Sequence, residues 1–175
     1  MSGSWRSRLA AVAALGLVLG GVTGGVAQAS PAHPAIRGCI ASQLRMKVGE
    51  GSGAAGTFAL ALVYTNKGSA CTLFGYAGVS FVTAHDAQIG AAATRDLNDH
   101  PHVVTLATGG HAESTVTYRD PGISGNCGGK VRAAFFKVYP PNDTGYRLAT
   151  FGKKVCRHTE NLNVRPVRAG AAIRY

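Results

Sequence analysis

The sequence predicts an all-β protein with two disulfides, and three observations lead to this expectation. Short runs of alternating apolar and polar residues recur about every ten residues, separated by Gly, Pro, Asn and Asp, as strands and turns require. No helical stripe of useful length follows residue 29. Four cysteines follow a leader typical of export, and in an oxidising compartment an even number of cysteines indicates disulfides rather than metal ligands or nucleophiles.

Residues 1–29 have the layout of a secretory signal peptide. Arg6 and Arg8 supply a positive start, an apolar run follows over residues 9–19, and Ala27-Gln28-Ala29 supplies a small-x-small cleavage site. An uncleaved anchor is the alternative, because residues 9–28 carry no charge, although the second half of this stretch is rich in glycine. We expect cleavage after Ala29, no membrane span in the mature chain, and a secreted protein that is extracellular or associated with the cell wall.

Cleavage would leave 146 of the 175 residues, a length that suits one domain with a core of its own. Residues 30–38 contain Pro31 and Pro34 and are predicted to form an extended lead-in. A single β-sandwich domain is predicted over residues 39–170.

The alternating runs predict eight or nine strands within this domain. Three segments rich in glycine or polar residues are predicted to be long loops, at 49–56, 95–102 and 120–129. The predicted strands are 42–48, 57–65, 72–74, 79–83, 103–106, 112–118, 131–138, 146–151 and 162–167, with a hairpin tip at 85–88 leading to Ile89.

Two antiparallel sheets packed face to face, as in an immunoglobulin-like β-sandwich, are the architecture that this pattern favours. A closed barrel is the alternative. No crossover helix is predicted between the strands, so nothing indicates a parallel sheet. The clearest strand is 57–65, in which Phe58, Leu60, Leu62 and Tyr64 share one face while apolar residues also line the other, so we expect it to be buried on both faces.

Residues 64–79 read YTNKGSACTLFGYAGV and combine a Thr-Asn turn with a cysteine, a leucine and two glycines. This stretch resembles the signature of the exported actinobacterial domain of unknown function 4232 family. The resemblance extends over residues 39–167, and Ala77 stands where the family pattern suggests proline. It implies an immunoglobulin-like β-sandwich in an exported protein and brings no known activity. The other matching pieces are Cys39, residues 106–112, Cys127, the pair Pro140-Pro141 and Cys156.

The four cysteines allow three pairings. We favour Cys39–Cys71 and Cys127–Cys156, because in each pair a cysteine near a loop can reach a strand end in the same half of the chain, and the family pattern suggests the same. Each bridge would close a loop of about thirty residues and stabilise the fold by about 3–4 kcal/mol.

Positive charge dominates the mature chain, which keeps 16 Lys and Arg against 8 acidic residues. Such a balance favours polyanionic partners. No aromatic residues alternate with the cations as a nucleic-acid platform requires, so no nucleic acid is expected. We expect an anionic cell-wall polymer, or another exported protein, as the partner. The candidate polyanion contacts are Lys153, Lys154, Arg157, Arg165 and Arg168.

No catalytic pattern stands out in the sequence, and we predict a non-catalytic exported domain without a cofactor that presents its three long loops for binding. A nucleophile elbow is absent, and the acidic residues are scattered. One alternative is a metal-dependent or other enzyme that uses Asp96, Asp99, His100 and His102 within the loop 96–102. Another is a protease inhibitor that presents the segment 120–127.

Overall fold

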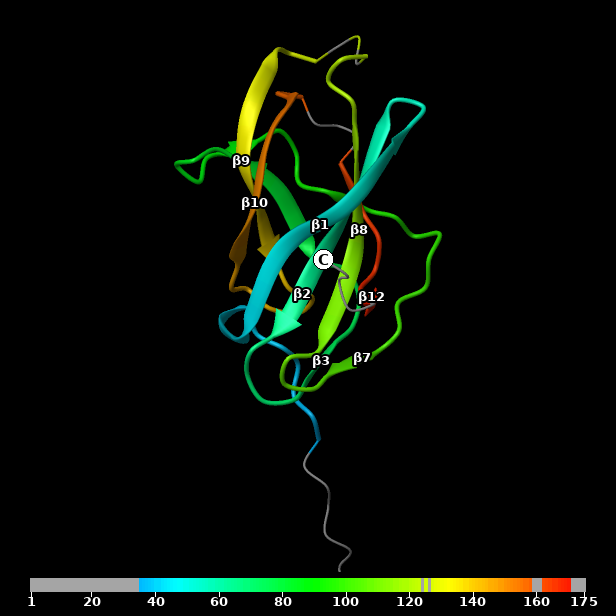
Figure 1. Ribbon diagram of the computed structural model, residues 1–175, viewed down its shortest axis with the longest axis vertical. Helices are drawn as coiled ribbons and strands as arrows, with labels where there is room; N and C mark the ends of the chain where they lie inside the picture. Colours follow the sequence, from blue (N-terminus) through cyan, green and yellow to red (C-terminus); the bar gives the residue numbers. More distant parts are fainter. Residues whose placement is uncertain (1–34, 124, 126, 159–161, 171–175) are drawn as a thin grey trace, which may run out of the picture. The chain divides into compact units, whose positions relative to one another are not determined.

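A computed structural model describes residues 35–123, 125, 127–158 and 162–170 (Figure 1). These residues belong to the compact unit Ala35–Tyr175, and the predicted signal peptide lies outside them. The all-β prediction is confirmed, because the regular elements found among these residues are strands and one short 3-10 helix, η1, over Ala41–Gln43. In the part of the chain that is described, no helix has the length and hydrophobicity of a membrane span.

Twelve strands are found among the described residues, and four of them contain only two residues. Alternation over two residues is too short to be seen in a sequence, which is why these four were not predicted as separate strands. The strands are β1 Leu44–Ala54, β2 Thr57–Asn66, β3 Cys71–Leu73, β4 Gly78–Val82, β5 Gln88–Ile89, β6 Thr94–Arg95, β7 Val104–Leu106, β8 His111–Arg119, β9 Lys130–Tyr139, β10 Arg147–Cys156, β11 Asn163–Val164 and β12 Arg168–Ala169.

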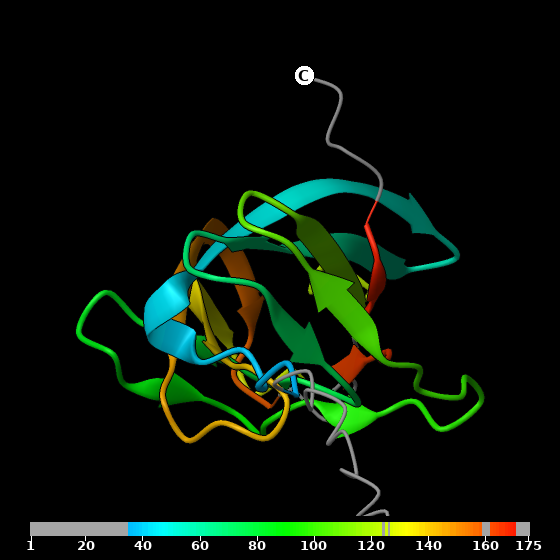
Figure 2. The same ribbon diagram turned by 90° about the horizontal axis from the view of Figure 1, so that it is seen from below.

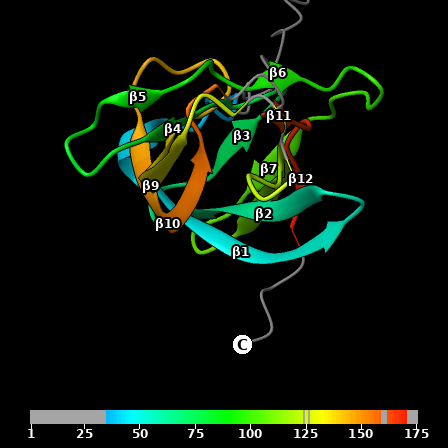
Figure 3. The same ribbon diagram turned by 90° about the horizontal axis from the view of Figure 1, so that it is seen from above.

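The strands form three sheets. The largest has the order β1-β2-β8-β11-β6, with β12 also paired to β8, and the second has the order β10-β9-β4-β5. Strands β3 and β7 form a separate two-stranded sheet. The third sheet was not expected, and neither was the parallel pairing of β11 with β6. Figure 3 shows that β1 and β10, each the last strand of its sheet, lie beside each other.

Residues 49–56 were predicted to be a loop, and this prediction is wrong. Strand β1 continues through them to Ala54, and the turn to β2 is made by Ala55 and Gly56, both with positive φ. The glycines are needed for packing, because a Cβ on Gly51 would lie 2.2 Å from Cδ2 of Leu60, its partner on β2. A segment held in a sheet in this way is not one of the adaptable contact loops that the sequence suggested.

The backbones of the two larger sheets can be followed in Figure 2, and an aromatic cluster connects the two sheets, because Phe81 and Tyr118 are in edge contact at 5.6 Å between ring centroids. Phe58 and Tyr118 come from the six-stranded sheet and stack at 5.3 Å between ring centroids. Phe81, Phe136 and Phe151 come from the four-stranded sheet, and neighbouring centroids lie 4.6–5.2 Å apart. Aromatic rings in such contact stabilise a core through both buried area and edge-to-face geometry.

The prediction that strand 57–65 is buried on both faces is confirmed only for the second half of the strand. Leu62 and Tyr64 are buried on the inner face, and Val63 is buried on the outer face at 4% exposure. Ala59 and Ala61 are only half-buried, so the first half of β2 faces solvent on its outer side. Burial raises the pKa of the Tyr64 hydroxyl, which donates a hydrogen bond to Ser114 Oγ at 3.1 Å.

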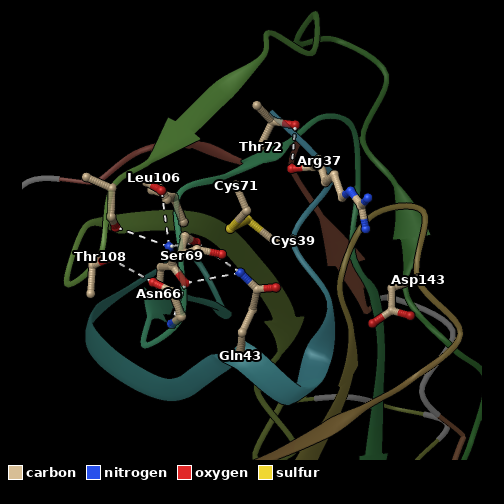
Figure 4. The surroundings of a disulfide bond; sticks show 12 residues. Arg37, Cys39, Gln43, Asn66, Ser69, Cys71, Thr72, Leu106, Thr108 and Asp143 are labelled. Atoms are coloured by element: carbon tan, nitrogen blue, oxygen red, sulfur yellow. Dashed lines mark hydrogen bonds between the residues drawn. A yellow bond between two sulfur atoms is a disulfide. The ribbon is translucent and has the colours of Figure 1, made fainter. Parts of the chain in front are cut away.

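Asn66, from the Thr-Asn turn, ends β2 and joins two turns (Figure 4). Its side chain is fully buried, and Nδ2 donates hydrogen bonds to the carbonyl oxygens of Ser69, Leu106 and Ala107 at 2.9–3.2 Å. Its Oδ1 accepts a hydrogen bond from the Gly68 N–H at 2.9 Å. This one amide therefore holds the β2–β3 turn against the β7–β8 turn.

The disulfide Cys39–Cys71 lies beside this junction (Figure 4). Both cysteines are buried at 2–3% exposure. The backbone around the bridge is also paired, because the Cys39 N–H donates to the Thr72 carbonyl at 2.8 Å and the Thr72 N–H donates to the Arg37 carbonyl at 2.9 Å. The bridge and these bonds attach the start of the domain to β3.

Asp143 holds the β9–β10 turn against η1. Its carboxylate accepts hydrogen bonds from the backbone N–H groups of Ala41 and Gly145. The Ala41 N–H bond is the main cause that keeps the pKa of Asp143 below its usual range. Because Ala41 is buried, loss of this acceptor would leave its N–H without a partner.

Acidification is expected to destabilise the protein partly through Asp143. A carboxylate whose pKa is lower in the folded state stabilises the fold above the unfolded pKa, near pH 4, and this stabilisation is lost as pH falls through the folded pKa. Urea unfolding at pH 6 and at pH 3 measures the loss. Asp143→Asn keeps an acceptor oxygen and removes the titration, so we expect a smaller drop between the two pH values than in the wild type. An identical drop in both proteins would contradict this assignment.

Candidate functional site

The five predicted polyanion contacts lie in two separate places. Lys153 and Lys154 lie on β10 of the four-stranded sheet, and Arg157 follows directly after that strand. Arg165 lies between β11 and β12, and Arg168 lies on β12, next to β8 of the six-stranded sheet. The predicted set is therefore not one surface.

Arg165 and Arg168 are engaged by carboxylates of the loop 96–102. Arg165 Nε lies 3.2 Å from Asp96 Oδ2, and Arg168 Nη2 lies 2.7 Å from Asp99 Oδ1. Arg165 also lies 3.5 Å from Asp99 Oδ2. Tyr76 fixes the same loop, because its hydroxyl donates to the carbonyl oxygens of Asp96 and Asp99 at 3.1 and 2.9 Å. We therefore leave both arginines out of the candidate polyanion surface.

The acidic residues that could have formed a metal site in this loop make other contacts in the structure. The Asn98 backbone N–H, together with Arg165, holds the pKa of Asp96 below its usual range. His100 and His102 are exposed. Within the described ranges, no group of three or more His, Cys, Asp or Glu is placed to hold a metal ion. The carboxylates of the loop 96–102 serve to attach it to the C-terminal strands.

The other three predicted contacts lie together with two further cations at one end of the β9–β10 pair, which we call the basic end. Arg132 on β9 and Lys154 on β10 are directly opposite each other in the register, so their side chains share the outer face of the sheet. Lys130 lies on the same face, two residues before Arg132. Lys153 points to the other face, where its Nζ lies 6.0 Å from the centroid of the Phe58 ring. The basic end consists of Lys130, Arg132, Lys153, Lys154 and Arg157.

The second disulfide holds the backbone of this end in place. Cys127 is bonded to Cys156, the last residue of β10. The Arg157 N–H donates to the Gly129 carbonyl at 2.9 Å, and the His158 N–H donates to the Cys127 carbonyl at 3.3 Å. The structure thus contains the two pairs of cysteines that the sequence analysis favours. Cations on a fixed backbone can bind a repeating anion with less loss of entropy than cations on a loop.

Lys130 and Arg132 were missed by the sequence analysis. The sequence does contain a signal for them, because positions 121–159 hold a single acidic residue, Asp143. That residue lies at the opposite end of the hairpin. Their position opposite Lys154 could not be read from the sequence, because it depends on the hairpin register. That register contains an irregularity between Thr150 and Lys153.

The described part of the chain is an all-β domain with two disulfides and a cationic end on one strand pair. The chain belongs to the family described as Domain of unknown function (DUF4232), whose family model matches residues 39–168. The family resemblance carried by residues 64–79 is thereby confirmed. No curated protein and no solved structure gives a significant match.

Proposed function

We propose that this protein is an exported, non-catalytic binding domain whose basic end holds an anionic polymer of the cell envelope. The two larger sheets form the faces of an immunoglobulin-like sandwich in this account, with the aromatic cluster as its core. The leader-like residues 1–29 and the two disulfides support an oxidising location outside the cell.

One observation carries the proposal: Arg132 and Lys154 are direct cross-strand neighbours. Like charges placed directly opposite each other destabilise a strand pair, so folding gains nothing from this arrangement. The salt bridges formed among described residues use Lys137, Arg165 and Arg168 as their cations, and none of these belongs to the basic end. An anion bound between Arg132 and Lys154 would turn their repulsion into attraction.

The double variant Arg132→Gln/Lys154→Gln is expected to lose binding and to gain a little stability. Binding to protein-free envelope polymer from an actinobacterium should fall at least tenfold at low salt, because two charge-assisted contacts are removed. Stability should rise by about 0.2–1 kcal/mol, because the cross-strand repulsion is removed. Co-sedimentation with the polymer and urea unfolding measure the two effects.

The matched control is Arg165→Gln/Arg168→Gln, which lowers the net charge by the same amount. Since these arginines already pair with Asp96 and Asp99, envelope binding should stay within about twofold of the wild type. Equal losses in the two double variants would mean that net charge alone drives binding, and the proposal would be wrong. Unchanged binding in Arg132→Gln/Lys154→Gln would also overturn it.

A further inference from the structure

Strands β1 and β10 are the adjacent last strands of the two larger sheets (Figure 3), and two hollows between them form a groove. One hollow of about 360 Å³ is lined by both strands and by the start of β2. A second hollow of about 320 Å³ continues along the same strands, and the two share Val48 and Thr150 in their lining. This size is at the lower end of the range found for small-molecule sites.

The first hollow combines an apolar floor, exposed backbone and one cation. Phe58, Leu60 and Phe151 supply the floor, and Tyr118, the partner of Phe58 on β8, stacks against the Phe58 ring. Gly49, Gly51 and Gly53 line one wall, so no side chains of their own keep a ligand away from that wall. Lys153 lies on the β10 wall, and the lining contains no acidic side chain.

The second hollow repeats the positive character. Arg45 and Lys47 line it from β1, while Leu148 and Thr150 line it from β10. Its lining also contains no acidic side chain. The groove therefore offers Lys153 in the first hollow, Arg45 in the second and an aromatic surface at one point, which suits a chain of rings that carry negative charge.

An incoming peptide strand fits this groove poorly. The register of β1 shifts between Val48 and Gly51, and that of β10 shifts between Thr150 and Lys153, so both edges are irregular beside the first hollow. Strand addition needs a continuous row of backbone donors and acceptors, and such irregularities interrupt that row. Rings joined end to end make no such demand on the backbone.

We propose that the groove between β1 and β10 binds a segment of an acidic polysaccharide. One sugar ring packs its C–H face against Phe58, because the face of an aromatic ring is negative and C–H groups are weakly positive. The carboxylate of that sugar pairs with Lys153. This inference rests on the proposed function and specifies its polymer: a chain of sugar rings bearing carboxylates, held by the groove as well as by the basic end.

The test measures binding of the purified protein to fluorescent tetragalacturonate by polarisation. Polyphosphate and polyglutamate of the same charge supply anions without sugar rings, and a neutral dextran tetramer supplies rings without charge. Tetragalacturonate should bind at least tenfold more tightly than each of the three. Equal binding of polyphosphate or polyglutamate would show that charge alone, or a peptide, is recognised, and would overturn the proposal.

Variants then locate the site. Thr150→Trp fills both hollows without changing charge, and Lys153→Gln removes the cation in the first; each should weaken tetragalacturonate binding about tenfold. Arg165→Gln, which removes a charge that already pairs with Asp96 away from the groove, should leave it within about threefold. Phe58→Leu provides a second test if Thr150→Trp fails to fold. If folded Thr150→Trp or Phe58→Leu binds tetragalacturonate as tightly as the wild type, the groove is not the binding site. This outcome is independent of how Arg132→Gln/Lys154→Gln binds envelope polymer.

Discussion

Asn66→Ala is expected to destabilise the protein by about 3 kcal/mol. The Asn66 side chain is fully buried, and its amide satisfies the carbonyls of Ser69 and Leu106 as well as the Gly68 N–H. Each buried backbone group left without a partner costs about 1–3 kcal/mol, and alanine replaces none of these bonds. The loss would separate the β2–β3 turn from the β7–β8 turn, so it should also lower the cooperativity of unfolding.

Urea unfolding followed by far-ultraviolet circular dichroism measures this effect. Thr108→Ala is the control at the same junction, because Thr108 Oγ1 donates to the Gly68 carbonyl at 2.8 Å from an exposed position. We expect a change within about 0.5 kcal/mol for this exposed threonine. A loss below 1 kcal/mol in Asn66→Ala, or equal losses in both variants, would contradict the role assigned to Asn66.

Removal of Cys39–Cys71 is expected to cost more than removal of Cys127–Cys156. The sequence separations are similar, 32 and 29 residues, so the chain-entropy relation gives about 3.5 kcal/mol for each bridge. The difference arises from packing. Cys39 and Cys71 both belong to the buried core, whereas Cys127 is half-exposed, so alanines in the first pair also leave unfilled space.

Two double variants, Cys39→Ala/Cys71→Ala and Cys127→Ala/Cys156→Ala, compare the bridges directly. The first should unfold at a lower urea concentration than the second.

In the native wild type, mild reductant should open Cys127–Cys156 first, because a half-exposed sulfur is easier for a thiolate to reach. Mass spectrometry of alkylated peptides identifies the bridge that opens. Opening of Cys39–Cys71 first would contradict this account of their burial.

Much of the fold could be predicted because the longer strands are uninterrupted runs of strand-forming residues. The expected segments 57–65, 112–118 and 131–138 match β2, β8 and β9 closely, since each contains at least seven residues without glycine or proline and includes β-branched or aromatic residues. The glycine-rich end of β1 was mistaken for a loop, because composition does not reveal that Leu60 and Phe58 pack across Gly51 and Gly53. The pairing of β6 with β11 joins distant short segments, and no local pattern carries that information.

The candidate site was predictable only in part, for a related reason. Lys153, Lys154 and Arg157 stand close together in the sequence, whereas Lys130 and Arg132 join them through the β9–β10 register. Arg165 and Arg168 looked equivalent in the sequence. Their pairing with Asp96 and Asp99 depends on a contact between segments about seventy residues apart.

The most direct test of the central claim is the affinity of the purified protein for envelope polymer as salt concentration is raised. Each cation that contacts the polymer releases counterions, so the logarithm of the affinity should fall steeply with the logarithm of the salt concentration. We predict a steep slope for the wild type. In Arg132→Gln/Lys154→Gln the slope should decrease by the amount that corresponds to about two lost charge contacts, and in Arg165→Gln/Arg168→Gln it should not change. No retention on the polymer at any salt concentration, or the same slope in all three proteins, would contradict the claim that the basic end binds an anionic polymer.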